Sequence, residues 1–148
     1  MNLNIHSKLK PLVTTNVNPL FHLIKSALPH LSNGAIIINS ASVDPYIGTP
    51  SRVDYATSKG AMIAFTRALS NQLVKKGIRV NAVAAGPVWS PLVATKGQKG
   101  HGLGNWTPME RFGQPSETAT SYVFLAGNES AFMSGKSLHP NGGIVVNR

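Results

Sequence analysis

The stretch AIIINSASVDPYIGTPSRVDYATSK, residues 35–59, decides the fold of this chain. It opens with a continuous apolar run at 35–39 that is rich in β-branched residues, which predicts a strand buried on both faces of a parallel sheet. Residues 43–54 contain two prolines and a glycine and predict a loop. Asp54 is a suitable N-cap for a long helix over 55–76, which Gly77 ends. A buried strand, a loop and a long helix form a unit typical of α/β proteins.

The same alternation continues on both sides of this unit. Towards the N-terminus, a helical period runs from Asn16 to near Pro29, and residues 1–13 are predicted to be an irregular segment. Towards the C-terminus, the patterns predict a strand over 78–84, a loop over 90–108, a helix from Pro115 and a short strand over 137–139. Helices that alternate with strands in this order predict an α/β fold with a parallel sheet, in which ligands bind beyond the carboxyl ends of the strands.

The composition limits the classes of function. The net charge is +9, from 14 Lys and Arg against 5 Asp and Glu, but the only adjacent cations are Lys75 and Lys76, so nucleic-acid binding is not expected. With no cysteine, the chain has no disulfide, thiolate zinc site or cysteine nucleophile, which fits a reducing, cytoplasmic location. The histidines are scattered and predict no metal site: His6, His22, His30, His101 and His139.

No targeting or membrane segment is expected. The first residues contain no apolar run of the kind found in signal peptides. No apolar run in the chain approaches the roughly 18 residues of a membrane span. The sequence therefore predicts neither secretion nor a membrane partner.

Tyr55, Lys59 and Ser42 together suggest a reaction. Residues i and i+4 share a face of a helix, so the Tyr55 phenol and the Lys59 ammonium can point into the same space. A phenol has a pKa of about 10 and is a poor acid–base catalyst at neutral pH, but a neighbouring cation lowers that pKa. The Ser42 hydroxyl, just after the strand, is placed to hold a carbonyl or alcohol oxygen. The three residues predict a proton-transfer site for carbonyl/alcohol interconversion.

Each of these residues also has a structural explanation. A tyrosine and a lysine four residues apart, as Tyr55 and Lys59 are, often form a simple pair on a helix surface. A serine such as Ser42 often caps a turn. Asn16 is a suitable helix cap, and Gly86-Pro87 ends a strand. Trp89 and Trp106 flank the 90–108 loop, where they serve either as a substrate lid or in ordinary packing.

Taken together, the motifs resemble the short-chain dehydrogenase/reductase family from about Asn16 to the C-terminus. Within the family, the subgroup of glucose-and-ribitol-dehydrogenase homologues and related aldehyde reductases is the most similar. The motifs that carry the resemblance are Asn16-Val17, the 36–42 run, Tyr55-x-x-x-Lys59, the 78–83 run, Gly86 to Leu92, Gly113-Gln114-Pro115 and Leu138 to Gly143.

The resemblance implies hydride transfer with NADP or NAD as cofactor and a small alcohol, sugar, aldehyde or ketone as substrate. By motif, Tyr55 is the acid/base and Lys59 assists it and holds the nicotinamide ribose. Ser42 orients the substrate oxygen, and Asn16 holds a water in a proton relay linked to Lys59. The residues implied in cofactor binding are Tyr55, Lys59, Gly86, Pro87, Val88 and Ser90.

The chain also departs from the family. No G-x-x-x-G-x-G turn is present to grip the pyrophosphate, and the residue that selects NAD or NADP is absent with it. Residues 14–148 therefore correspond to the C-terminal part of a doubly wound Rossmann-like sheet, its last three strands and their helices. Ala85 replaces a usual proline, Ser90 replaces a usual threonine, and Pro19 interrupts an expected helix. Weak or absent cofactor binding is expected from the chain alone.

Three hypotheses follow. The first is an NAD(P)-dependent oxidoreductase. The second is a catalytically incompetent, truncated reductase that pairs with a full-length homologue, because in the family the helices matching 16–29 and 55–75 pack across a dimer interface and a homo-oligomer is common. The third is a basic binding module, which would need steep salt-dependent retention on DNA.

Overall fold

The computed structural model describes residues 6–94 and 106–146, and its centre is a parallel sheet. The strands β1 (Ile36–Ser40), β2 (Arg79–Val83) and β3 (Ser137–Leu138) lie in the order β1-β2-β3. Ile36 is opposite Arg79, and Ala82 is opposite Ser137. The predicted α/β class with a parallel sheet is confirmed.

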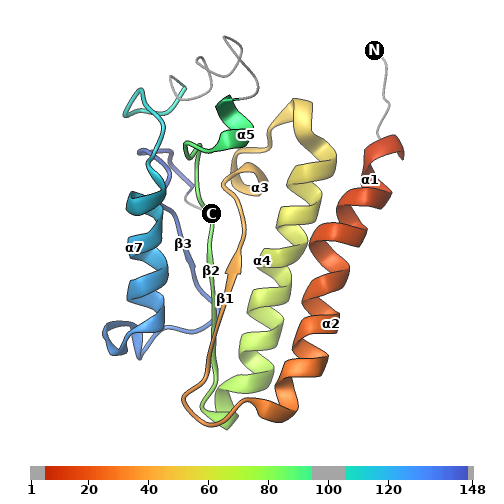
Figure 1. The fold of residues 1–148 in the computed structure, drawn as a ribbon, viewed down its shortest axis with the longest axis vertical. Helices are drawn as coiled ribbons and strands as arrows, with labels where there is room; N and C mark the ends of the chain where they lie inside the picture. Colours follow the sequence, from red (N-terminus) through yellow and green to blue (C-terminus); the bar gives the residue numbers. More distant parts are fainter. Residues whose placement is uncertain (1–5, 95–105, 147–148) are drawn as a thin grey trace.

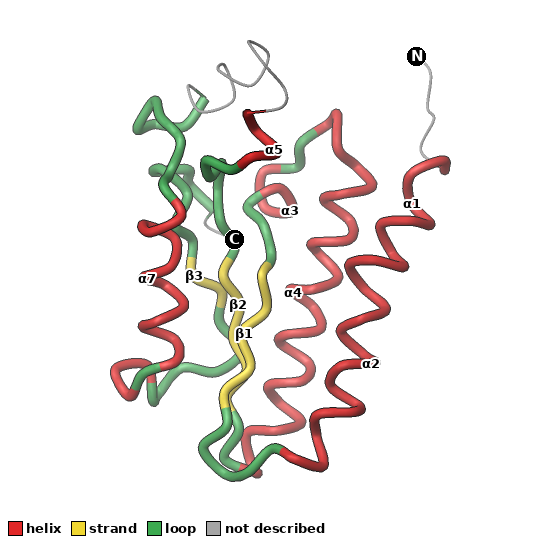
Figure 2. Tube along the Cα trace, viewed as in Figure 1, coloured by secondary structure: helices red, strands yellow, loops and turns green. Residues whose placement is uncertain are grey.

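Helices cover both faces of the sheet (Figure 1). The long helix α4 (Val53–Leu73), continued by a 3₁₀ turn at Val74–Lys76, lies on one face, and α7 (Pro115–Ala126) lies on the other. On the outer side of α4, a continuous helical segment is formed by α1 (His6–Leu12), the π-helical η1 (Val13–Val17) and α2 (Asn18–Ala27), as Figure 2 shows. None of the helices in the described ranges is long and apolar enough to cross a bilayer.

The core lies between α4 and the central strand β2. Leu69 and Leu73 from α4 pack with Ile78 and Val80, and all four side chains are buried. The half-buried side chains packed around them come from α2 and the segment that follows it, from β1 and from α4: Ile24, Leu28, Leu31, Ala35, Ile37 and Phe65. Full burial stabilises the fold by about 1.5–3 kcal/mol for each large side chain, as for Leu69, Leu73, Ile78 and Val80.

The prediction that β1 is buried on both faces is wrong. Ile36, Ile37 and Ile38 are only half-buried. Among the described residues β1 is an edge strand, because only β2 pairs with it. Its apolar side chains are therefore covered less completely than those of β2, where Val80, Ala82 and Val83 are buried.

The prediction of an irregular segment over 1–13 is also wrong for the residues that the structure describes. His6–Leu12 is helical, and the π-helical η1 joins it to α2. Pro19 lies in the first turn of α2, directly after η1, whose bonds span five residues, as in the bond from the Asn18 amide to the Val13 carbonyl. The π-helical turn thus accommodates the proline that the sequence places inside an expected helix.

The 43–54 segment is mostly short helices and not a loop. Pro45 and Pro50 lie in the first turns of α3 (Asp44–Ile47) and of a 3₁₀ turn, Pro50–Arg52, where proline is favoured. The helix α4 begins at Val53, so Asp54 lies within its first turn and is not the N-cap. The Asp54 carboxylate accepts a hydrogen bond from the amide of Tyr55 at 2.8 Å.

On the C-terminal side, two polar groups fix α7. At its start, the side chains of Gln114 and Glu117 form a capping box. At its end, the Arg79 guanidinium of β2 donates to the carbonyls of Leu125, Gly127 and Ser130. Part of the predicted 90–108 loop is the short helix α5 (Pro91–Ala94), and residues 95–105 of it lie outside the described residues.

Candidate functional site

Tyr55 and Lys59 lie together on the first turns of α4. The Lys59 Nζ is 5.8 Å from the centroid of the Tyr55 ring, and both residues are half-buried. The ammonium donates a 2.8 Å hydrogen bond to the carbonyl oxygen of Ser40, the last residue of β1. Burial lowers the pKa of Lys59 below its ordinary 10.5. The helix and the strand end thus hold a cation beside the phenol ring.

Ser42 follows β1 and is buried in a polar network around Asp44. The Ser42 Oγ donates to Asp44 Oδ2 at 3.0 Å and accepts from the Asp44 amide at 3.2 Å. The same carboxylate pairs with Arg52 at 3.0 Å and accepts from Thr49. The Arg52 guanidinium lies 5.8 Å from the centroid of the Tyr55 ring. Ser42 is thereby linked to Tyr55 through Asp44 and Arg52.

Asn16 lies in η1 and contacts the first turns of α4 through Ser58. Its Nδ2 donates to Ser58 Oγ at 3.1 Å, and the Ser58 hydroxyl in turn donates to the Tyr55 carbonyl at 2.8 Å. Asn16 is therefore joined to Ser58 and not to Lys59. Ser58 directly precedes Lys59 in the sequence, and the bonds from Asn16 lead through it to the Tyr55 carbonyl.

The segment after β2 presents backbone groups at the same end of the sheet. A parallel bridge pairs Val88 with Gly113, through a bond from the Gly113 amide to the Pro87 carbonyl and one from the Trp89 amide to the Gly113 carbonyl. These two bonds use the Pro87 carbonyl and the Trp89 amide, which flank Val88. The amide and the carbonyl of Val88 itself therefore point away from Gly113. The Ser90 carbonyl accepts from the Val93 amide at the start of α5.

Gly86, which was predicted to bind the cofactor, is also needed for packing against the turn after β3. A Cβ atom at this position would lie 2.7 Å from the Cα of Asn141, which is shorter than real contacts of a Cβ. The Gly86 amide also donates to the Pro140 carbonyl at 3.1 Å. Only glycine lets the end of β2 pass this close to the turn after β3.

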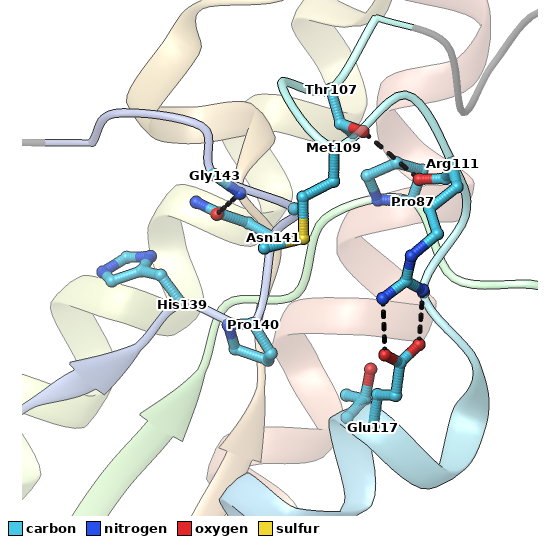
Figure 3. A pocket seen from close by; sticks show the side chains of 12 residues that line it. Pro87, Thr107, Met109, Arg111, Glu117, His139, Pro140, Asn141 and Gly143 are labelled. Carbon is cyan, nitrogen blue, oxygen red and sulfur yellow. Dashed lines mark hydrogen bonds and ion pairs between the residues drawn. The ribbon is translucent and has the colours of Figure 1, made fainter.

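A cleft of about 390 Å³ lies between the end of β2, the turn after β3 and the start of α7 (Figure 3). Of the predicted site residues only Pro87 lines it. On one wall the Arg111 guanidinium makes two 2.7 Å bonds to the Glu117 carboxylate. These bonds lower the pKa of Glu117 to about 2 and raise that of Arg111. This cleft is distinct from the Tyr55 and Lys59 pair.

A second pocket, of about 330 Å³, adjoins the Ser42 network. Asp44 and Arg52 line it together with Trp106, whose side chain is 45% exposed. Trp106 therefore forms part of a pocket wall, whereas Trp89 packs edge-to-face on Phe112 with ring centroids 5.9 Å apart.

Three residues of the site were not predicted: Asp44, Arg52 and Ser58. The spacing Ser42-x-Asp44 is a signal for the first, because a serine often bonds the backbone two residues on. The other two have no local signal, since their contacts depend on how η1 and the 50–52 turn pack against α4. In the described ranges, 6–94 and 106–146, no group of three or more His, Asp or Glu side chains is arranged to hold a metal.

Comparison with known proteins identifies the family. The family model described as enoyl-(acyl carrier protein) reductase matches residues 6–145. A crystal structure of a short-chain dehydrogenase/reductase, a glucose/ribitol dehydrogenase from Brucella melitensis, superposes with a TM-score of 0.83 at 34% identity, over 91% of this chain and 55% of that one. The chain belongs to the short-chain dehydrogenase/reductase family.

Relatives within this family are similar over almost the whole chain. Glucose and ribitol dehydrogenase of Daucus carota is 47% identical over 95% of this chain and 49% of its own length. NADPH-dependent aldehyde reductase 1, chloroplastic, of Arabidopsis thaliana is 49% identical over 95% of this chain and 50% of its own. This short-chain dehydrogenase/reductase chain thus spans about half the length of the curated relatives it matches.

Proposed function

We propose that this chain carries the catalytic residues of an NAD(P)-dependent oxidoreductase, which interconverts an alcohol or sugar and an aldehyde or ketone. The observation that carries the proposal is the placement of Lys59 against both the Tyr55 ring and the end of β1. Ser42 follows the same strand end and is linked back to Tyr55 through Asp44 and Arg52. A phenol, a cation and a hydroxyl gathered at the carboxyl end of a parallel sheet fit acid–base chemistry on an oxygen.

In this proposal Tyr55 donates a proton to the substrate oxygen during reduction and accepts one during oxidation. Lys59 stabilises negative charge on the phenol oxygen, and its bond to the Ser40 carbonyl fixes its position. Ser42 holds the substrate oxygen. Asn16 keeps its proposed place in a proton relay, and its bond to Ser58 fixes it against the first turns of α4.

The residues after β2 fit the nicotinamide end of a cofactor. The amide and carbonyl of Val88 point away from Gly113 and are suited to bind a carboxamide, with Gly86, Pro87 and Ser90 shaping the backbone around it. When bound, NADP or NAD supplies or accepts the hydride. The 148 residues contain no G-x-x-x-G-x-G motif of the kind that binds the pyrophosphate, so in this proposal chain outside these residues fills that role.

A chimera tests this function. Residues 6–145 replace the matching half of the Daucus carota relative, and oxidation of NADPH with an aldehyde is followed by absorbance. Turnover is expected, and Tyr55→Phe is expected to reduce it by about a hundredfold or more while cofactor affinity stays within about twofold. Tyr122→Phe is the matched control, because it removes a phenol hydroxyl that lies on α7 and is hydrogen-bonded to Ser40 Oγ. A Tyr55→Phe chimera that keeps most of the rate would refute the assignment.

A second candidate is a non-catalytic chain that pairs with a full-length homologue. The observation that favours it is the apolar exposure of α2, where Phe21 and Leu23 are 57% and 67% exposed. Co-purification of the tagged 148-residue chain with the Daucus carota relative would support this pairing, if Phe21→Asp removes it. Loss of pairing in Val123→Asp, on α7, with retention in Phe21→Asp would contradict the role of α2.

A further inference from the structure

A polar pocket of about 580 Å³ lies away from the Tyr55 and Lys59 pair, between α3, α4 and β3. Its walls include seven polar side chains: Tyr46, Arg67, Asn71, Ser134, Lys136, Ser137 and His139. Arg67 and Asn71 are four residues apart on α4 and therefore share one face of that helix. Lys136 directly precedes β3 and Ser137 begins it, so the cations of Arg67 and Lys136 approach the pocket from separate elements.

Among the described residues, no carboxylate is paired with Arg67 or Lys136. No Asp or Glu lines the pocket. In the described part of the chain, the ion pairs are Arg52 with Asp44 and Arg111 with Glu117, so Arg67 and Lys136 are in neither. With 5 acidic residues against 14 Lys and Arg in the sequence, few carboxylates are available to neutralise them. Two unpaired cations in one concave site attract an anion.

The pocket wall also contains hydrogen-bonding groups that the protein does not use. The Tyr46 hydroxyl and the His139 Nδ1 are buried and have no hydrogen-bond partner among the described residues. Their rings pack edge-to-face with centroids 4.6 Å apart. In Figure 3 the His139 ring points away from the Arg111 and Glu117 pair. Burial lowers the pKa of His139, which favours the neutral imidazole as a hydrogen-bonding group in the pocket wall.

We propose that this pocket binds the phosphate group of a small molecule, between Arg67 on α4 and Lys136 at β3. A guanidinium matches two phosphate oxygens at once, and an ammonium binds a third as a point charge. Asn71 and Ser137 add neutral donors on the two walls. The pocket is larger than inorganic phosphate, so a phosphomonoester fits as well as the free ion.

An NMR titration of the ¹⁵N-labelled 148-residue chain tests the site. Inorganic phosphate is added at constant ionic strength, maintained with sodium chloride, and the amides of Lys136 and Ser137 are followed. Saturable shifts are expected, with a Kd on the order of 1 mM or below. A parallel titration uses glycerol 3-phosphate: tighter binding assigns the site to phosphomonoesters, and equal or weaker binding assigns it to the free ion. Shifts that sodium chloride alone reproduces overturn the proposal.

Variants locate the binding within the pocket. Arg67→Gln and Lys136→Gln are each expected to weaken phosphate binding about tenfold or more, since each removes charge-assisted hydrogen bonds. Lys75→Gln removes the same charge outside the pocket and is expected to leave the affinity unchanged. Circular dichroism establishes that each variant is folded, and Arg67→Lys provides a second, milder variant of that position. Equal losses in Lys75→Gln, or unchanged affinity in both pocket variants, would show that the pocket does not bind phosphate.

Discussion

At the scale of single residues, Ser42 and Asp44 act as a pair. Ser42 donates its only hydroxyl hydrogen to Asp44 and accepts from the amide of the same residue. While these bonds persist, its remaining lone pair can accept a hydrogen bond from an alcohol substrate, and Ser42 must release the Asp44 carboxylate before it can donate to a carbonyl. In the proposed site, Asp44 therefore determines which hydrogen bond Ser42 can offer the substrate oxygen, and Arg52 pairs with the same carboxylate.

Removing the Asp44 carboxylate tests this dependence. In the chimera, Asp44→Ala is expected to lower kcat about tenfold, because Ser42 and Arg52 both lose their shared partner. It is also expected to lower the free energy of unfolding by about 1–3 kcal/mol, because Ser42 is buried. The control Asp54→Ala removes an acceptor for one backbone amide only. Steady-state kinetics and urea unfolding measure the two effects. A kcat of Asp44→Ala within about twofold of the parent chimera would show that Asp44 does not contribute to catalysis.

The sequence predicts the residues of the site better than their partners. The spacing of Tyr55 and Lys59 places both on one helix face because a local period determines it. The bond from Asn16 to Ser58 joins residues 42 positions apart, and the bond from Lys59 to the Ser40 carbonyl crosses from helix to strand. Such contacts depend on how elements pack, and no local pattern encodes them.

At the scale of elements, Gly86 fixes how the end of β2 meets the turn after β3. Gly86→Ala is expected to lower the free energy of unfolding by about 1–3 kcal/mol, because the new Cβ would overlap the Asn141 backbone. Gly60→Ala in α4 is the matched control: its Cβ would lie 3.7 Å from Pro45, an ordinary contact, and alanine favours helix. Chemical denaturation measures both. Equal stability changes for the two variants would contradict the close approach of Gly86 to the Asn141 backbone.

The start of α7 carries a pH-dependent contribution to stability. Arg111 and the Gln114 amide bind the Glu117 carboxylate and lower its pKa from 4.5 to about 2. Because the folded-state pKa is the lower one, this stability is fully present above about pH 4.5 and is lost as the pH falls towards 2. The stability difference between the native chain and Glu117→Gln is therefore expected to shrink over that range. A difference that stays constant from pH 6 to 2 would contradict the pairing.

Element predictions succeed where the apolar period is clear and fail where proline obscures it. The positions of α4, β2 and α7 follow from periodicity and from stop signals such as Gly77, whose φ of 70° ends the 3₁₀ turn after α4. The helix at His6–Leu12 contains Pro11, and Pro45 and Pro50 begin short helical turns in a predicted loop. Proline marks both helix starts and loops, so composition alone does not separate the two.

At the scale of the whole molecule, the described residues account for one part of the proposed cofactor and substrate site. The sheet ends at β1, whose free edge and half-buried isoleucines have no neighbouring strand among the described residues. An edge of this kind pairs readily with a further strand. The chain spans about half the length of its curated relatives, which fits a division in which it supplies the catalytic residues and the nicotinamide end of the cofactor site.

The affinity for NADPH tests this division most directly. Fluorescence titration compares the 148-residue chain with the chimera that joins residues 6–145 to the other half of the Daucus carota relative. Two or three charge-assisted bonds to the pyrophosphate are absent from the chain alone, so its Kd is predicted to be weaker by about a hundredfold or more. Equal affinity in the two proteins would contradict the account, because it would place the whole cofactor site within these 148 residues.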